Sequence, residues 1–190
     1  MKKLVITIII FINLTFISNI SHASVIKYYN FVELINKSDL IVLGKVISIK
    51  SYQKEKGRIY SDIKFRVKRI YKGQYNDTED ITFTYLGGTL DGITTIVLEY
   101  PQFIKNQESI LFLNKNSQKN NKQNKYTITA LSQGKFNIYP DYKNNFYVIR
   151  DRFADYTLEI IKDGNRVYLD NRNNIPLNDF ISYLNECINK

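Results

Sequence analysis

The chain has 190 residues, a length at which one domain can bury a sizeable core, with 27 Lys and Arg residues against 18 Asp and Glu residues. It contains one Cys, one His and no Trp, so an intramolecular disulfide cannot form and any catalytic site can use only one thiol and one imidazole. The formal net charge of +9 favours anionic partners, although a composition biased towards Lys, Asn and Ile would produce it without any ligand.

The first residues have the pattern of a signal peptide. Lys2 and Lys3 form a positive start, residues 4–17 are mostly apolar, and Ala23 is the small residue that signal peptidases accept. We therefore expect cleavage between Ala23 and Ser24.

This cleavage would define the organisation of the chain. Residues 1–23 would be the signal peptide and residues 24–190 a single domain, secreted or periplasmic. An uncleaved membrane anchor is the alternative, and no later segment has the roughly 20 apolar residues of a transmembrane helix. Cleavage also removes His22, the only histidine of the chain.

A short helix and then a long strand are expected at the start of the domain. Asn30 and Glu33 have the spacing of a capping box, which predicts a helix over residues 28–37. Residues 40–49 are rich in β-branched side chains and predict a strand, in which Gly44 indicates a bulge or a sharp bend.

After a turn over residues 54–57, the next strand alternates strictly. One face carries the apolar residues Ile59, Ile63, Phe65 and Val67. The other carries Tyr60, Asp62, Lys64, Arg66 and Lys68. This pattern predicts one buried face and one solvated, basic face.

The remaining elements follow at the spacing of a β-barrel or a β-sandwich. We expect strands over residues 80–86, 93–100, 109–113 and 126–131, and hairpins over residues 136–149 and 158–169. Residues 114–125 contain no apolar side chain and predict a mobile loop. A helix follows Pro176, with Cys187 beside its apolar stripe, so we expect a packed thiol.

No catalytic motif has the context that its chemistry requires. Without His22, neither a Ser-His-Asp nor a Cys-His site can form, and zinc is left with carboxylates and one Cys. Two matches to the S-x-x-K motif, at residues 51–54 and 61–64, lie on a strand or a turn instead of a helix. The spacing of the carboxylates nearest the strands selects no acid–base pair; these are Asp62, Asp91 and Glu99. We therefore predict no enzymatic activity, no cofactor and no metal site.

The basic strand face is the feature that could bind a ligand. Its candidate residues are Tyr60, Lys64, Arg66 and Lys68, and oligonucleotide-binding barrels use aromatic and basic residues in this way. Export argues against nucleic acid as the partner, so an unknown protein or an anionic envelope component is expected. A merely solvated face is the alternative interpretation.

Several segments resemble a family of exported bacterial proteins without assigned function. They are residues 38–46, 69–73, 87–92, 101–103, 108–113 and 131–136. More distantly, the order of strands and turns is similar to netrin-type modules and to metalloprotease inhibitors of the TIMP type. Both resemblances imply a barrel related to the oligonucleotide/oligosaccharide-binding (OB) fold.

The TIMP mechanism itself does not follow from this resemblance. TIMP modules chelate the zinc of the protease with a disulfide-tethered amino-terminal Cys, whereas the expected start here is Ser24 and the chain has one Cys. We therefore expect this chain to share the fold of TIMP modules but not their zinc-chelating mechanism.

Together these observations predict a mainly β fold, a small OB/TIMP-like antiparallel barrel with an N-terminal and a C-terminal helix. The expected function is an exported, non-enzymatic binding module that uses the basic face, or the loops near Gly87 and over residues 114–125. The alternative is a protease inhibitor that acts by inserting a strand or a loop, and an enzyme based on carboxylates comes third.

Overall fold

The computed structural model describes residues 27–54, 57–75, 80–116, 126–150, 157–162, 165–170 and 175–189. Its elements are α2 (Phe31–Lys37), β1 (Leu40–Gln53), β2 (Ile59–Lys72), β3 (Ile81–Leu86), β4 (Gly88–Leu90), β5 (Ile93–Thr95), β6 (Glu108–Lys115), β7 (Tyr126–Ile128), the 3₁₀-helix η2 (Leu131–Gly134), β8 (Lys135–Pro140), β9 (Phe146–Arg150), β10 (Thr157–Lys162), β11 (Asn165–Asp170), β12 (Ile175–Pro176) and α3 (Leu177–Ile188). The predicted signal peptide, its cleavage site at Ala23 and Ser24, and most of the predicted loop over residues 114–125 lie outside the described residues.

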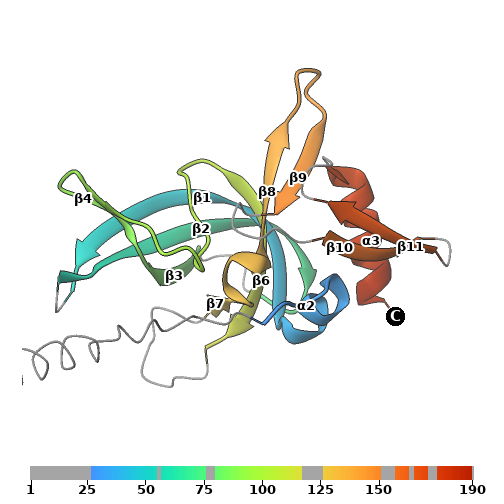
Figure 1. The fold of residues 1–190 in the computed structure, drawn as a ribbon, viewed down its shortest axis with the longest axis horizontal. Helices are drawn as coiled ribbons and strands as arrows, with labels where there is room; N and C mark the ends of the chain where they lie inside the picture. Colours follow the sequence, from blue (N-terminus) through green and yellow to red (C-terminus); the bar gives the residue numbers. More distant parts are fainter. Residues whose placement is uncertain are drawn as a thin grey trace, which may run out of the picture.

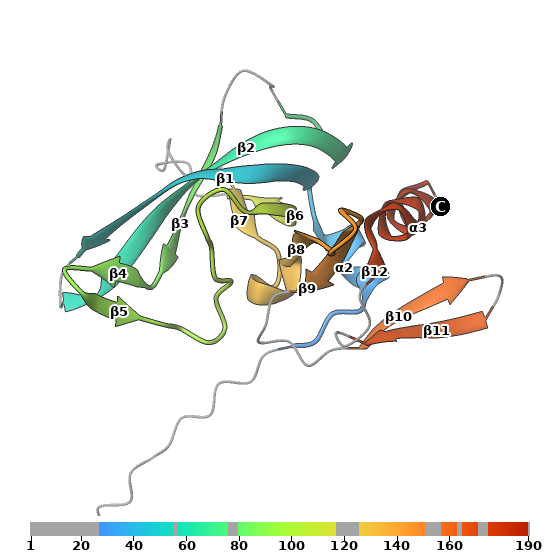
Figure 2. The same cartoon turned by 90° about the horizontal axis from the view of Figure 1, so that it is seen from above.

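One large antiparallel sheet forms the body of the fold (Figure 1). Its strands follow the order β12-β9-β8-β6-β1-β2-β3, and β7 also pairs with β6. The long β1–β2 hairpin arches over the other strands, as Figure 2 shows. The pairs β4–β5 and β10–β11 form two small sheets of their own. The predicted mainly β architecture, with one helix before the sheet and one at the C-terminal end, is confirmed.

The first residues of β1 and the middle of β6 are buried on both faces of the sheet. In β1, Leu40 and Val42 join one hydrophobic core and Ile41 joins another, and Leu111 and Phe112 of β6 divide in the same way. A strand covered on both sides needs apolar residues at successive positions, which is why both strands begin or centre on continuous apolar runs.

The first core, here called the inner core, lies inside the curl of the sheet. Its residues are Leu40, Val42, Val46, Ile63, Phe65, Ile81, Phe83, Tyr85, Phe103, Leu111, Leu113 and Tyr126. Both β3 and β7 contribute to it, although no ladder joins these two strands within the described part of the chain. The rings of Tyr75 and Tyr126 meet here at a centroid distance of 6.2 Å.

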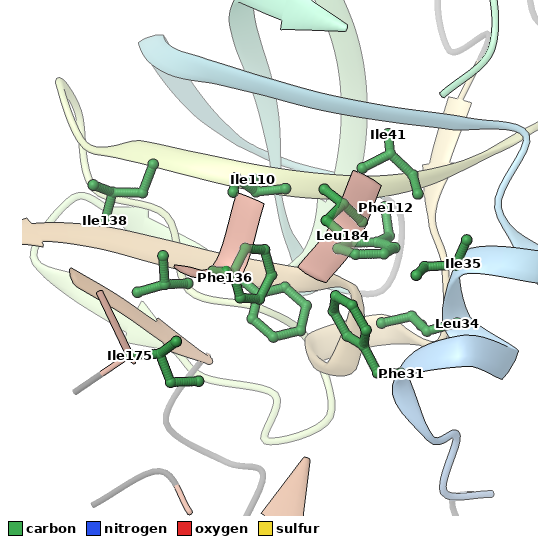
Figure 3. Close-up of a cluster of buried hydrophobic side chains, with 12 residues drawn as sticks. Phe31, Leu34, Ile35, Ile41, Ile110, Phe112, Phe136, Ile138, Ile175 and Leu184 are labelled. Carbon is green, nitrogen blue, oxygen red and sulfur yellow. The ribbon is translucent and has the colours of Figure 1, made fainter. Parts of the chain in front are cut away.

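The second core, here called the helix core, packs both helices against the sheet (Figure 3). Its residues are Phe31, Leu34, Ile35, Ile41, Ile110, Phe112, Phe136, Ile138, Val148, Ile175, Phe180 and Leu184. The Phe31 ring lies 5.8 Å from that of Phe112 and 5.3 Å from that of Phe180, so one α2 side chain touches both β6 and α3. Cys187 is a free thiol packed against this core, as predicted. Among the helices described, none is long and apolar enough to cross a membrane.

The capping box at the start of α2 is present. The backbone N–H of Glu33 donates to Asn30 Oδ1 at 2.8 Å, and the N–H of Asn30 donates to Glu33 Oε2 at 3.0 Å. Because Asn30 is the cap, the helix begins at Phe31 and not at Tyr28.

Gly44 produces the irregularity that its position in the strand predicts. The register between β1 and β2 shifts between Leu43 and Gly44, and again on either side of this pair. The backbone of β2 passes so close that a Cβ at position 44 would overlap the carbonyl oxygen of Arg66. The φ of Gly44 is not positive, so its backbone conformation does not require glycine. Glycine is required because the backbone of β2 leaves no room for a side chain.

Two predicted strands end earlier than expected. The strand over residues 93–100 stops at Thr95, because the following chain turns inward and buries Pro101 and Phe103 against the sheet. The strand over residues 126–131 stops at Ile128, because Ala130 and Leu131 adopt left-handed conformations, with φ of 53° and 58°, at the start of η2.

Candidate functional site

Most of the net positive charge of the chain is concentrated in one hairpin. Residues 40–72, which form β1, β2 and the turn between them, contain ten Lys and Arg residues and two acidic residues, a net charge of +8 out of +9 for the whole chain. Concentrated charge on one element is the usual electrostatic signature of an anion-binding surface.

The four candidate residues lie on one side of this hairpin. Lys64, Arg66 and Lys68 are exposed and Tyr60 is half-buried, whereas the alternate residues Ile63 and Phe65 belong to the inner core. The outer face is defined here as Lys45, Lys50 and Tyr52 of β1, Tyr60, Asp62, Lys64, Arg66 and Lys68 of β2, and Thr82 and Thr84 of β3. The predicted alternation is confirmed, and the binding role of these residues stays a prediction.

Two of the four candidates have carboxylate partners from other elements. Arg66 Nε and Nη2 donate to the two carboxylate oxygens of Asp80 at 2.9 and 3.1 Å, and this pair raises the pKa of Arg66. Lys68 Nζ donates to Glu108 at the start of β6. Their charges are therefore largely balanced, which the pattern of β2 alone does not reveal.

The charges without a carboxylate partner come from both strands. Of the residues described, ion pairs involve Arg66 and Lys68, and none involves Lys45, Lys50 or Lys64. Lys45 lies opposite Arg66, and Lys64 lies opposite Ser48. We missed Lys45 and Lys50 in the sequence, although pairing the two strands across the predicted turn would have found them.

Two tyrosines form an aromatic platform at the tip of the hairpin. The rings of Tyr52 and Tyr60 stack at a centroid distance of 6.4 Å, and Lys54 Nζ lies 4.9 Å from the Tyr60 centroid. Asp62 fixes the platform, because its Oδ1 accepts hydrogen bonds from the Tyr52 hydroxyl at 3.1 Å and from Thr84 Oγ1. The face thus combines free cations with preorganised aromatic rings.

The end of β2, beyond the four candidate residues, has a structural role. Lys72 Nζ donates to the carbonyl oxygen of Ile35 at 2.6 Å and so fastens the end of α2. Tyr71 packs against the helix core, and its hydroxyl is shielded from solvent and has no hydrogen-bond partner among the residues described. Burial raises the pKa of Tyr71 above its ordinary value of 10.0, and the nearby charge of Arg69 opposes this effect.

Replacing Tyr71 with Phe is expected to stabilise the protein by about 0.5–1 kcal/mol, because it removes a buried hydroxyl that makes no hydrogen bond. Urea unfolding at neutral pH measures this change. The contribution of Tyr71 to the free energy of unfolding is fully present below the pKa that this residue has in the unfolded chain. It is lost as the pH rises through the higher pKa that Tyr71 has in the folded protein. The Phe variant should therefore also lose less stability than the wild type above about pH 10. A destabilised Phe variant would mean that the hydroxyl has a partner.

Other candidate residues from the sequence are used by the fold. Ser51 and Ser61 of the S-x-x-K matches bond each other at 2.9 Å, and Ser61 Oγ donates to the Gly87 carbonyl at 2.7 Å. Asp91 lies in the exposed β4–β5 turn. Within the residues that the structure describes, no group of three or more His, Cys, Asp or Glu side chains is placed to hold a metal ion.

Comparison with known proteins assigns no identity to the chain. No family model matches it, and no curated protein or solved structure is significantly similar to it.

Proposed function

We propose that this protein is an exported, non-enzymatic binding module that holds an anionic partner on its outer face. The observation that carries the proposal is that Lys45, Lys50 and Lys64 form no ion pair with any carboxylate that the structure describes, and that they lie in register with β1 and β2 beside the Tyr52–Tyr60 platform. Lys50 and Lys64 are exposed and Lys45 is half-buried, so all three cations can attract anionic groups, and the rings offer apolar and cation–π contact at the same surface.

The shape of the face favours a flexible chain as the partner. β1 and β2 arch over the fold, so their outer side is convex (Figure 2). A convex surface meets a flat bilayer over a small area only, whereas an extended polymer can follow the strands for most of their length. The partner is therefore an acidic protein segment or another polyanion of the cell envelope.

The OB-like barrel is proposed as the fold that presents this face. In its support, β1 pairs with both β2 and β6, and β3 and β7 share the inner core although no ladder connects them in the described chain. OB-type barrels are partly open and bind polymers on the outer surface of their strands.

Charge reversal tests the proposed function. We expect the triple variant Lys45→Glu, Lys50→Glu, Lys64→Glu to bind fluorescently labelled polyglutamate at least about tenfold more weakly than the wild type, because three attractive contacts become repulsive. Fluorescence anisotropy at low salt measures the affinity, and rising salt should weaken wild-type binding.

A second triple variant provides the matched control. Lys37, Lys115 and Lys143 are exposed and lie away from the outer face, and their replacement by Glu changes the net charge equally. This variant should bind polyglutamate within about threefold of the wild type. Equal losses in the two triple variants would show that net charge, and not the outer face, drives binding, and unchanged binding in the first would exclude this face.

A further inference from the structure

A groove with apolar walls lies next to the outer face. It has a volume of about 390 Å³ and runs between the chain before β6 and the β8–β9 hairpin. Ile104 and Phe146 form its walls with 62% and 51% of their surfaces exposed. Gln107 Nε2 donates to the Tyr139 hydroxyl at 2.8 Å and holds that side chain in the lining.

The groove and the outer face are continuous through Glu108. This residue lines the groove, accepts a hydrogen bond from Lys68, and lies directly opposite Lys45 in the β1–β6 ladder. Lys105 adds a further exposed cation to the groove lining. A ligand on the outer face can therefore reach the groove without crossing other structure.

We propose that this groove takes one bulky apolar side chain of an acidic, extended protein segment whose carboxylates lie on the outer face. The inference rests on the proposed function and names its partner class. The groove is at the small end of ligand sites, about 300–1,000 Å³, which suits one side chain. Its exposed aliphatic wall at Ile104 favours an apolar side chain over a sugar ring, and the adjacent lysines complement carboxylates.

The strand geometry sets the spacing between the apolar residue and the carboxylates. From Glu108 the path crosses the sheet to Lys45 of β1 and then to Arg66 of β2, two intervals of about 4.8 Å each. It then runs along β2 for two residues, of about 3.4 Å each, to Lys64. Because the two directions are perpendicular, Glu108 and Lys64 are separated by about 12 Å. An extended peptide covers this distance with about four residues. The partner should therefore carry its apolar side chain about four residues from its acidic run.

Two labelled peptides test the inference. One has a single Phe, a spacer of about four Gly and Ser residues, and a run of Glu, and its twin has Ala in place of Phe. We expect the wild type to bind the Phe peptide about tenfold more tightly than the Ala twin, because the groove removes the ring from water. In the double variant Ile104→Ser, Phe146→Ser, both peptides should bind with the affinity of the Ala twin.

A matched control uses exposed apolar residues elsewhere. Ile96 and Leu98 are 58% and 60% exposed and do not line the groove, so the double variant Ile96→Ser, Leu98→Ser should retain the preference for Phe. Thermal melting of each variant checks the fold, which changes at exposed positions should preserve.

The outcomes separate this inference from the proposed function. Equal binding of the two peptides by the wild type would overturn the groove assignment and leave the outer face standing. The anionic polysaccharide polygalacturonate serves as a further probe. If the wild type binds it and the Ile104/Phe146 variant does not, the assignment is also overturned, because the groove would then hold a sugar. If the wild type binds neither Glu-containing peptide, nor polyglutamate, nor polygalacturonate, the proposed function itself fails.

Discussion

Replacing Gly44 with Ala is expected to destabilise the protein by about 3–5 kcal/mol, a loss that can unfold a typical domain. The new methyl group would overlap the Arg66 carbonyl oxygen and lie 2.5 Å from Cε1 of Phe65. The backbone of β1 cannot move away, because it is paired with β2 on one side and with β6 on the other. Urea unfolding followed by circular dichroism measures the change.

Gly92 supplies the control for this experiment. It has a φ of 79°, which disfavours Ala, but nothing lies within 4 Å of its added Cβ. Its replacement by Ala should therefore cost about 1–2 kcal/mol from backbone strain alone. Similar losses at the two positions would show that the close approach of β2 to Gly44 has no energetic consequence.

Local features of this fold could be predicted where one short segment determines the outcome. The Asn30–Glu33 spacing identifies the start of α2, the alternation after Ile59 identifies both faces of β2, and Gly44 marks the bulge of β1. Each of these signals depends on residues within one turn or one strand.

The balance of charges on the outer face could not be predicted in the same way. Arg66 is paired with Asp80, 14 residues away, and Lys68 is paired with Glu108, 40 residues away. Which carboxylate meets which cation depends on the sheet order, which strand-by-strand patterns do not specify. The candidate site predicted from the sequence lies on β2 alone, whereas in the structure it is shared by β1 and β2 and includes Lys45 and Lys50.

The irregular chain after β5 was missed because its anchor is also distant in sequence. Gln102 and Phe103 are held by Lys135, the first residue of β8, which is completely buried. A buried lysine is rare, and nothing in the sequence around Lys135 distinguishes it from the many exposed ones. The alternation over residues 93–100 therefore predicted a strand where a long-range contact imposes a loop.

The same contact supports the second large prediction, that replacing Lys135 with Ala destabilises the protein by about 3 kcal/mol. Lys135 Nζ donates to the Gln102 carbonyl at 2.6 Å and to Asn137 Oδ1, and it lies 4.9 Å from the centroid of the Phe103 ring. The Ala variant removes these charge-assisted bonds, leaves the Gln102 carbonyl without this donor and opens a cavity. Urea unfolding measures the loss.

Lys135→Met separates the amine from the bulk of the side chain. Met fills a similar volume without a charge, so this variant opens no large cavity. We expect it to lose only about 1–2 kcal/mol of stability, because in the wild type the cost of removing the ammonium group from water offsets part of the energy of its hydrogen bonds. A Met variant more stable than the wild type would contradict the anchoring role. Because Gln102 and Phe103 directly precede Ile104, the Met variant should also show faster hydrogen exchange over residues 101–104 and a weaker preference for the Phe peptide. Its affinity for the Ala twin should stay unchanged, since the lysines of the outer face do not depend on this loop.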